Sequence, residues 1–273
     1  MHMKNHKIVL LFIAFHLSIS LLAQQDMATA ISSKNFDPAT LLWYDAPAKK
    51  WEDALPVGNG RIGAMVFGRN AEERIQLNEE TYWSGGPYST VVKGGYKVLP
   101  EIQKKVFEEK YLQAHNLFGR HLMGYPVEQM KYQCLANLHL FFKNQDSIRN
   151  YKRWLNLQTG IAGTAYTANG ITYLREVFAS VPDQVIVVRI TASQPGSISL
   201  TANLRGERNQ THSNYATDYF KMDGFGTDGL ILSGKSADYM GVEGKLRYEA
   251  RIKAITDGGS IRTDDVDLII ENA

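Results

Sequence analysis

TAYTANGITYLREVF, residues 164–178, places Asn169 and Gly170 between two short runs that are rich in β-branched and aromatic side chains. Residues of these types are favoured in β-strands. Asn and Gly tolerate the positive φ angles that a two-residue hairpin turn requires at its central positions. The stretch therefore predicts two antiparallel strands joined by a tight turn.

Comparable runs recur along most of the chain, separated by residues that are typical of turns. They are RIGAMVFG (61–68), ERIQLNEETYW (73–83), YQCLANLHLFF (132–142), QVIVVRITA (184–192), SISLTANL (197–204), GLILSGK (229–235) and KLRYEARIKAI (245–255). A second hairpin is expected at Asp257, Gly258 and Gly259, between RIKAI and SIRT. Many short strands with little helix indicate a mostly β fold. We expect a large antiparallel β-sandwich, supersandwich-like, over residues 41–273.

One segment has the periodicity of a helix. In EIQKKVFEEKYLQAHNLFGRHL, residues 101–122, apolar side chains recur at helical spacing with charged residues between them. These apolar residues are Ile102, Val106, Ala114, Leu117 and Leu122. Pro100 directly precedes the segment, and proline suits the start of a helix. We expect one short-to-medium α-helix over about residues 101–117.

The N-terminal residues 1–23 have the organisation of a secretory signal peptide. Lys4 and Lys7 precede an apolar run, IVLLFIAFHLSISLLA at residues 8–23, and the polar QQD follows at once. Cleavage after Ala23 would leave a polar connector, residues 24–40, and a periplasmic or secreted protein without a membrane span. The alternative is an uncleaved N-terminal anchor.

The charge balance bears on the possible partners. The chain carries +2 at pH 7, and removing residues 1–23 removes two lysines and no acid, which leaves a net charge of 0. A neutral chain has no electrostatic preference for nucleic acid or for an anionic membrane, so we expect no nucleic-acid partner. Cys134 is the only cysteine, so no intrachain disulfide can form.

Gly58, Gly60 and Gly63 in LPVGNGRIGAMVFG, residues 55–68, match the G-x-G-x-x-G pattern of dinucleotide-binding proteins. That pattern holds a pyrophosphate where a helix begins after the glycines. Here the apolar run AMVF and then another strand-like segment follow instead. We interpret the glycines as positions of tight turns and close backbone approach, and we expect no cofactor.

Three longer segments together resemble a known family. They are LWYDAPAKKWEDALPVGNGRIGAMVFG (42–68), ERIQLNEETYWSGGP (73–87) and REVFASVPDQVIVVR (175–189). The combination resembles the N-terminal domain of glycoside hydrolase family 95, the α-L-fucosidase family. The resemblance covers about residue 41 to the end of the chain.

The resemblance implies a multi-domain, inverting glycosidase: an N-terminal β-sandwich, a helical linker, an (α/α)₆ barrel with the catalytic Glu and Asp, and a C-terminal β-domain. The barrel motifs do not occur in this sequence. We therefore expect the N-terminal domain of a secreted enzyme that acts on glycans with terminal α-L-fucose or L-galactose, without its catalytic barrel. The alternative is a non-catalytic β-sandwich that binds carbohydrate or serves as a scaffold.

The candidate site residues are Asn78, Glu79, Glu80 and Trp83. An inverting glycosidase needs two carboxyl groups that flank the scissile bond, about 6.5–9.5 Å apart. Adjacent strand residues point to opposite faces, so Glu79 and Glu80 are not expected to form such a pair. The resemblance places this loop near the junction with the barrel, in an interdomain contact or close to sugar.

Other groups give no catalytic or metal site. His115 and His121 are six residues apart and do not share a helix face, and no paired Cys/His spacing suggests a metal. Asp264, Asp265 and Asp267 lie in a polar, turn-like stretch, and Asn209 begins an N-x-T glycosylation pattern. We expect no catalytic residue in this chain.

Overall fold

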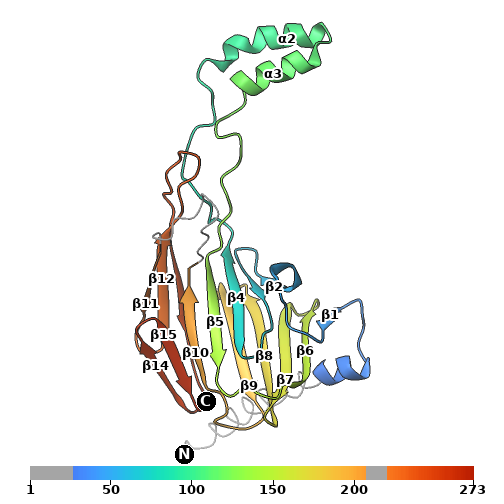
Figure 1. Ribbon diagram of the computed structural model, residues 1–273, viewed down its shortest axis with the longest axis vertical. Helices are drawn as coiled ribbons and strands as arrows, with labels where there is room; N and C mark the ends of the chain where they lie inside the picture. Colours follow the sequence, from blue (N-terminus) through green and yellow to red (C-terminus); the bar gives the residue numbers. More distant parts are fainter. Residues whose placement is uncertain (1–26, 207–219) are drawn as a thin grey trace, which may run out of the picture.

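The computed structural model describes residues 27–206 and 220–273. Within these residues the protein is mostly β, as expected, and its strands form three antiparallel sheets (Figure 1). The expected signal peptide, residues 1–23, and the glycosylation pattern at residues 209–211 lie outside the described residues.

Strands that follow each other in sequence pair in all three sheets, and the five- and seven-stranded sheets also contain long-range pairings. The five-stranded sheet has the order β1 (Leu41–Tyr44), β6 (Arg149–Asn156), β7 (Ile161–Ala168), β8 (Ile171–Ser180) and β9 (Val185–Ala192). The seven-stranded sheet has the order β14 (Ser260–Asp264), β15 (Asp267–Glu271), β10 (Leu200–Arg205), β5 (Ala136–Phe142), β4 (Glu72–Glu79), β3 (Ile62–Val66) and β2 (Leu55–Gly58). The three-stranded sheet has the order β11 (Phe220–Gly224), β12 (Gly229–Lys235) and β13 (Arg247–Lys253). A short 3₁₀ helix, η1 (Trp51–Asp53), precedes β2.

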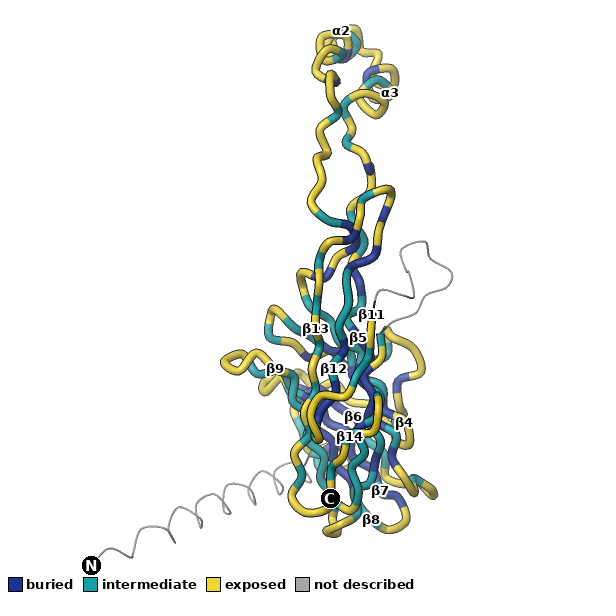
Figure 2. The backbone as a smooth tube through the Cα atoms, turned by 90° about the vertical axis from the view of Figure 1, so that its left-hand side faces the viewer, coloured by how far each residue is buried: buried dark blue, intermediate teal, exposed yellow. Residues whose placement is uncertain are grey.

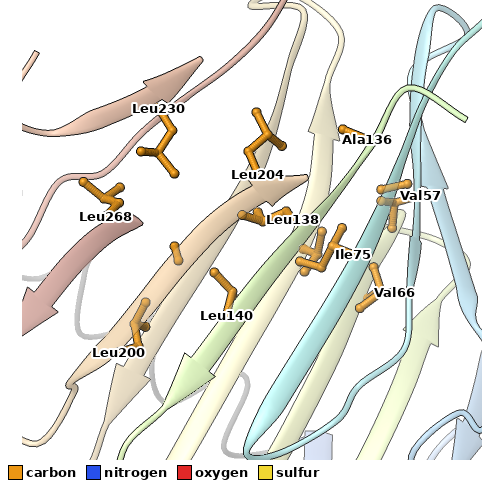
Figure 3. Packing of buried hydrophobic residues seen from close by; sticks show 14 of the residues in the cluster. Val57, Val66, Ile75, Ala136, Leu138, Leu140, Leu200, Leu204, Leu230 and Leu268 are labelled. Atoms are coloured by element: carbon orange, nitrogen blue, oxygen red, sulfur yellow. The ribbon is translucent and has the colours of Figure 1, made fainter. Parts of the chain in front are cut away.

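One continuous apolar core joins the three sheets. Alternate residues of the seven-stranded sheet face it, as in the cross-strand pair Ile75 and Leu138. The same cluster includes residues of β7 and β8 and of β12, so both smaller sheets pack on one face of the seven-stranded sheet. Figure 2 shows the buried positions concentrated within the sandwich, and Figure 3 shows Leu230 of β12 near Leu204 and Leu268. This packing is the large β-sandwich that the strand pattern predicts.

Two tight turns form where the glycine patterns predict them. β7 and β8 pair as a hairpin in which Ala168 lies opposite Ile171, while Asn169 and Gly170 have φ angles of 50° and 82°. The G-x-G-x-x-G glycines lie in the β2–β3 hairpin, where Gly58 is paired with Gly63. Strand β3 follows these glycines, so they form no helix-terminal phosphate site.

The hairpin expected at Asp257, Gly258 and Gly259 is wrong. Both glycines do have positive φ angles, 81° and 63°. However, the preceding strand β13 pairs with β12 in the small sheet, and the following strand β14 pairs with β15 in the seven-stranded sheet. The turn therefore carries the chain from one sheet to another, because each flanking strand has a better-buried partner elsewhere.

The segment expected to form one helix forms two. Helices α2 (Leu99–Phe107) and α3 (Tyr111–His121) lie side by side at the end of a long projection from the sandwich (Figure 1). Glu109, between them, has a left-handed φ of 58°, which reverses the chain. The reversal packs α2 on α3 and buries Ile102 and Ala114, which a single straight helix would leave without a neighbouring element.

The segment expected as a polar connector is partly structured. Residues 27–33 are helical, and Ile31 is buried with Leu41 and Trp154 on the face of the five-stranded sheet that points away from the main core. Gly163 lies directly under the Trp154 indole, where a Cβ atom would come within 2.3 Å of the ring. Glycine is therefore required at this position for the indole to lie flat on the sheet.

Candidate functional site

The four candidate residues lie at the end of β4, where the chain leaves the sandwich for the projection. Trp83 and Tyr132 form an isolated antiparallel bridge there, with their rings 5.2 Å apart and nearly perpendicular. The Tyr132 hydroxyl donates to the Glu79 carbonyl oxygen at 3.1 Å. The Trp83 Nε1–H group donates to the Glu80 carbonyl oxygen at 3.0 Å. Both rings remain partly exposed, so this bridge joins the two ends of the projection at the surface of the sandwich.

The Glu79 carboxylate stabilises the turn that follows β4. Its Oε2 atom accepts hydrogen bonds from the Thr81 backbone N–H at 2.8 Å and from the Thr81 hydroxyl at 2.6 Å. Its Oε1 atom lies 3.7 Å from a guanidinium nitrogen of Arg61. These contacts hold the Glu79 carboxylate as a cap on the turn.

Asn78 and Glu80 do not complete a catalytic pair with Glu79. Asn78 lies opposite Gly63 in the β3–β4 ladder, and Glu80 is an exposed residue of the turn beyond the strand. Glu80 and Glu79 therefore belong to different local structures. The geometry at this loop supports the folding of the turn and provides no carboxyl pair around a common cleft.

The Ser84–Gly85–Gly86 segment connects the projection to the small sheet. Ser84 Oγ accepts a hydrogen bond from the Lys131 backbone N–H, and the Gly85 N–H group donates to the Ala237 carbonyl oxygen at 2.7 Å. Gly85 has a φ of 70°, and a Cβ atom there would lie 2.5 Å from the Met130 sulfur. The glycines of this motif allow a close contact between the projection and the loop after β12.

The structure also reveals a buried ion pair that sequence reasoning missed. Glu73 on β4 and Arg175 on β8 are both fully or almost fully buried, and their Oε2 and Nη2 atoms are 2.6 Å apart across the core. Glu73 Oε1 accepts hydrogen bonds from the backbone N–H groups of Gly68 and Arg74, at 2.9 and 3.1 Å. Arg175 Nη2 also donates to the Arg69 carbonyl oxygen. Strand alternation contained the signal, because Glu73 shares a face with Ile75.

Burial raises the pKa of the Glu73 carboxyl above its ordinary value of 4.5, and the charge of Arg175 opposes this shift. A raised carboxyl pKa is a property of many catalytic acids. Glu73 has 0% exposed surface, however, so no substrate reaches it in this fold. The pair is best explained as a polar contact that joins the two sheets and holds the β3–β4 loop.

The described part of the chain contains neither a metal-binding cluster nor a membrane-spanning helix. In residues 27–206 and 220–273, no group of three or more His, Cys, Asp or Glu side chains is arranged to hold a metal ion. In the same ranges, no helix is both long enough and apolar enough to cross a membrane. Asp264 and Asp267 are paired at the β14–β15 turn, in agreement with the turn-like sequence around them.

The fold and the candidate loop together define a large β-sandwich domain in which the loop carboxylate of Glu79 has local structural partners. Comparison with known proteins identifies the family to which this domain belongs. A family model described as "Glycosyl hydrolase family 65, N-terminal domain" matches residues 42–273. The chain therefore belongs to this family of glycosyl hydrolase N-terminal domains.

Curated relatives agree with the family. Alpha-L-fucosidase 2 of Arabidopsis thaliana is 35% identical over 169 residues, which is 61% of this chain and 20% of the relative. A probable alpha-fucosidase A of Aspergillus niger is 30% identical over 240 residues, 84% of this chain and 28% of the relative. A probable alpha-fucosidase A of Aspergillus oryzae is 30% identical over 185 residues, 64% of this chain and 24% of the relative.

These findings confirm the expected glycoside hydrolase N-terminal β-sandwich, although the sequence resemblance pointed to family 95 and the matching model describes family 65. The aligned part of the chain spans between 20% and 28% of the length of these relatives.

Proposed function

We propose that this chain is the N-terminal domain of a secreted α-L-fucosidase that removes terminal α-L-fucose from glycans. The observation that carries the proposal is the alignment of 84% of the chain with a probable alpha-fucosidase A. The match to alpha-L-fucosidase 2, at 35% identity, supports the same activity. The apolar run at residues 8–23, preceded by Lys4 and Lys7, supports export to the periplasm or the medium.

In this proposal the sandwich supports a catalytic barrel and does not itself cleave the glycosidic bond. Inverting hydrolysis needs an acid and a base that face each other across the bond, with room for a water molecule. At the candidate loop, Glu79 is engaged by Thr81 and Arg61. Glu73, whose carboxyl pKa is raised by burial, is enclosed in the core.

The test compares this chain with a longer polypeptide in which the same domain is followed by its catalytic domain. Both are assayed on a chromogenic aryl α-L-fucoside after removal of host glycosidases. We expect turnover only with the longer polypeptide, and Glu79→Gln should change its kcat by less than about threefold, because the substitution removes a turn contact and no acid. Turnover by the shorter chain that disappears in Glu79→Gln would place the chemistry in the sandwich.

Sugar binding by the sandwich is a second candidate, and it has one specific observation in its favour. The face of the seven-stranded sheet that points away from the core carries a hydrogen-bonded polar network. Arg74 Nε donates to Asn137 Oδ1 at 2.7 Å, and Asn203 Nδ2 donates to Asp267 Oδ1 at 2.6 Å. Asn137 and Asn203 are themselves buried, so the half-buried Arg74 and Phe141 are the groups of this face that can contact sugar hydroxyls and a sugar ring. Titration calorimetry with fucosylated oligosaccharides, on wild type and Arg74→Ala, tests it.

A further inference from the structure

The projection exposes more large apolar side chains, for its length, than the rest of the described molecule. We call residues 84–131 the arm, and its two helices α2 and α3 the head. More than half of the large hydrophobic side chains that are exposed in the described residues lie in the arm or in the Trp83–Tyr132 bridge at its base. Yet the arm makes up only about a fifth of the described residues. An apolar surface of this density marks a contact with another protein surface.

The two helices of the head are too short to bury its apolar side chains by packing on each other. Its helices have 9 and 11 residues, and helices of that length are marginal in water without tertiary packing. Each buries one residue, Ile102 in α2 and Ala114 in α3. Phe107, Tyr111 and Leu112, around the turn between the helices, are 87%, 64% and 74% exposed. The turn end of the head therefore presents an aromatic and aliphatic tip to its surroundings.

The base of the arm is fixed to the sandwich, so the head is held at a distance by defined contacts. The Tyr239 hydroxyl donates to Glu128 Oε2 at 2.7 Å, and Lys131 Nζ lies 2.7 Å from the same oxygen. The two legs of the arm also touch each other, since a Cβ atom on Gly124 would come within 2.8 Å of the Thr90 carbonyl oxygen. Figure 2 shows the arm as a narrow, mostly exposed extension that ends in the head.

The charge of the arm restricts what can cover it. Residues 84–131 contain seven Lys and Arg residues against four Glu residues, a net charge of +3. The complementary surface should therefore be apolar with an acidic rim. In the curated relatives, 72–80% of the chain lies outside the aligned region, since that region spans 20–28% of their length. A large covering surface is thus available within a single polypeptide of that kind.

We propose that the head is the docking element by which this domain binds the catalytic domain of a longer polypeptide. The identity of the occupant rests on the proposed function. The arm reaches past the sandwich, the Phe107–Leu112 tip enters an apolar depression on the catalytic domain, and the lysines of the arm face acidic side chains around it. A second copy of this chain is the competing occupant.

Hydrogen exchange measured by mass spectrometry tests the docking directly. The shorter chain and the longer polypeptide are compared over peptides that cover α2 and α3. We expect exchange in the head to be at least about tenfold slower in the longer polypeptide, because its helices are then covered. The double substitution Phe107→Ser and Leu112→Ser should abolish this protection. Ile255→Ser, at a site that is 88% exposed in the sandwich, is the matched control and should preserve it.

The possible results separate docking from activity. Equal exchange of the head in both polypeptides overturns the docking proposal. It is also overturned if light scattering shows a dimer of the shorter chain that Phe107→Ser and Leu112→Ser disrupts, while the longer polypeptide gives no added protection. A protected head in a polypeptide that does not hydrolyse an aryl α-L-fucoside supports docking and rejects the proposed function. Fucosidase activity in a longer polypeptide whose head is not protected supports the proposed function and rejects docking.

Discussion

Glu73 and Arg175 form an ion pair inside the sandwich, with 2.6 Å between Oε2 and Nη2, although they come from strands of different sheets. Removing one partner of a buried pair leaves an uncompensated charge, which is more costly than removing both. The pair therefore gives a sensitive test of the packing between β4 and β8.

We expect Arg175→Met to lower the free energy of unfolding by about 3–5 kcal/mol at neutral pH, because Glu73 is then buried without its counter-charge. The double variant Glu73→Leu and Arg175→Met should recover most of that loss. Urea denaturation followed by tryptophan fluorescence measures both. A single-variant loss below about 1 kcal/mol would show that Glu73 is neutral or hydrated in the folded protein.

The pH dependence of stability should carry the signature of Glu73. Its pKa in the folded state is raised above the ordinary value of 4.5, so the folded protein binds this proton more tightly than the unfolded chain. The resulting stability is fully present below about pH 4.5 and is lost as the pH rises through the folded pKa. The unfolding free energy of the wild type, relative to Glu73→Gln, should therefore fall as the pH is raised from about 4.5 through the folded pKa. A rise over that interval would contradict the direction of the shift.

Two glycine substitutions should have opposite effects on stability. In Gly163→Ala the new Cβ atom would meet the Trp154 indole at 2.3 Å, and we expect a loss of about 1–3 kcal/mol from the forced repacking. Gly119 lies within α3 with open space around its Cβ position, so Gly119→Ala should stabilise the head by about 0.5–1 kcal/mol. Thermal unfolding reports the first effect. Hydrogen exchange in the head reports the second, because the head is remote from the core.

The apolar tip of the head should also be detectable in the shorter chain by itself. An environment-sensitive apolar dye should fluoresce in its presence, and Phe107→Ser with Leu112→Ser should reduce that signal by at least about half, since these side chains are 87% and 74% exposed. Ile255→Ser should change it little, because Ile255 lies between β13 and β14 and is not part of the arm. An unchanged signal in the double variant would place the dye-binding surface elsewhere.

Local chemistry in the sequence determined the strands and several of the turns. Asn169 and Gly170 adopt positive φ angles in any context that permits a hairpin, and the alternation in β4 and β5 assigns each residue to a face whichever strand lies opposite. For the candidate loop at Glu79 the sequence predicts no facing carboxyl pair, and in the structure Glu79 caps a turn in which Glu80 is an exposed residue. These features depend on a few neighbouring residues, so a single sequence contains them.

Only the tertiary structure decided which segments meet. The turn at Gly258 and Gly259 has the φ angles of a hairpin but connects two sheets, because each flanking strand is buried better against a strand that is distant in sequence. The helical periodicity of residues 101–122 continues through Glu109, and the chain reverses there because the two halves can bury Ile102 and Ala114 by packing together. Glu73 and Arg175 each follow the inward pattern of their own strand, but their pairing requires two sheets to close over the same point. Periodicity and turn propensity are set over a few residues, whereas burial depends on partners far along the chain.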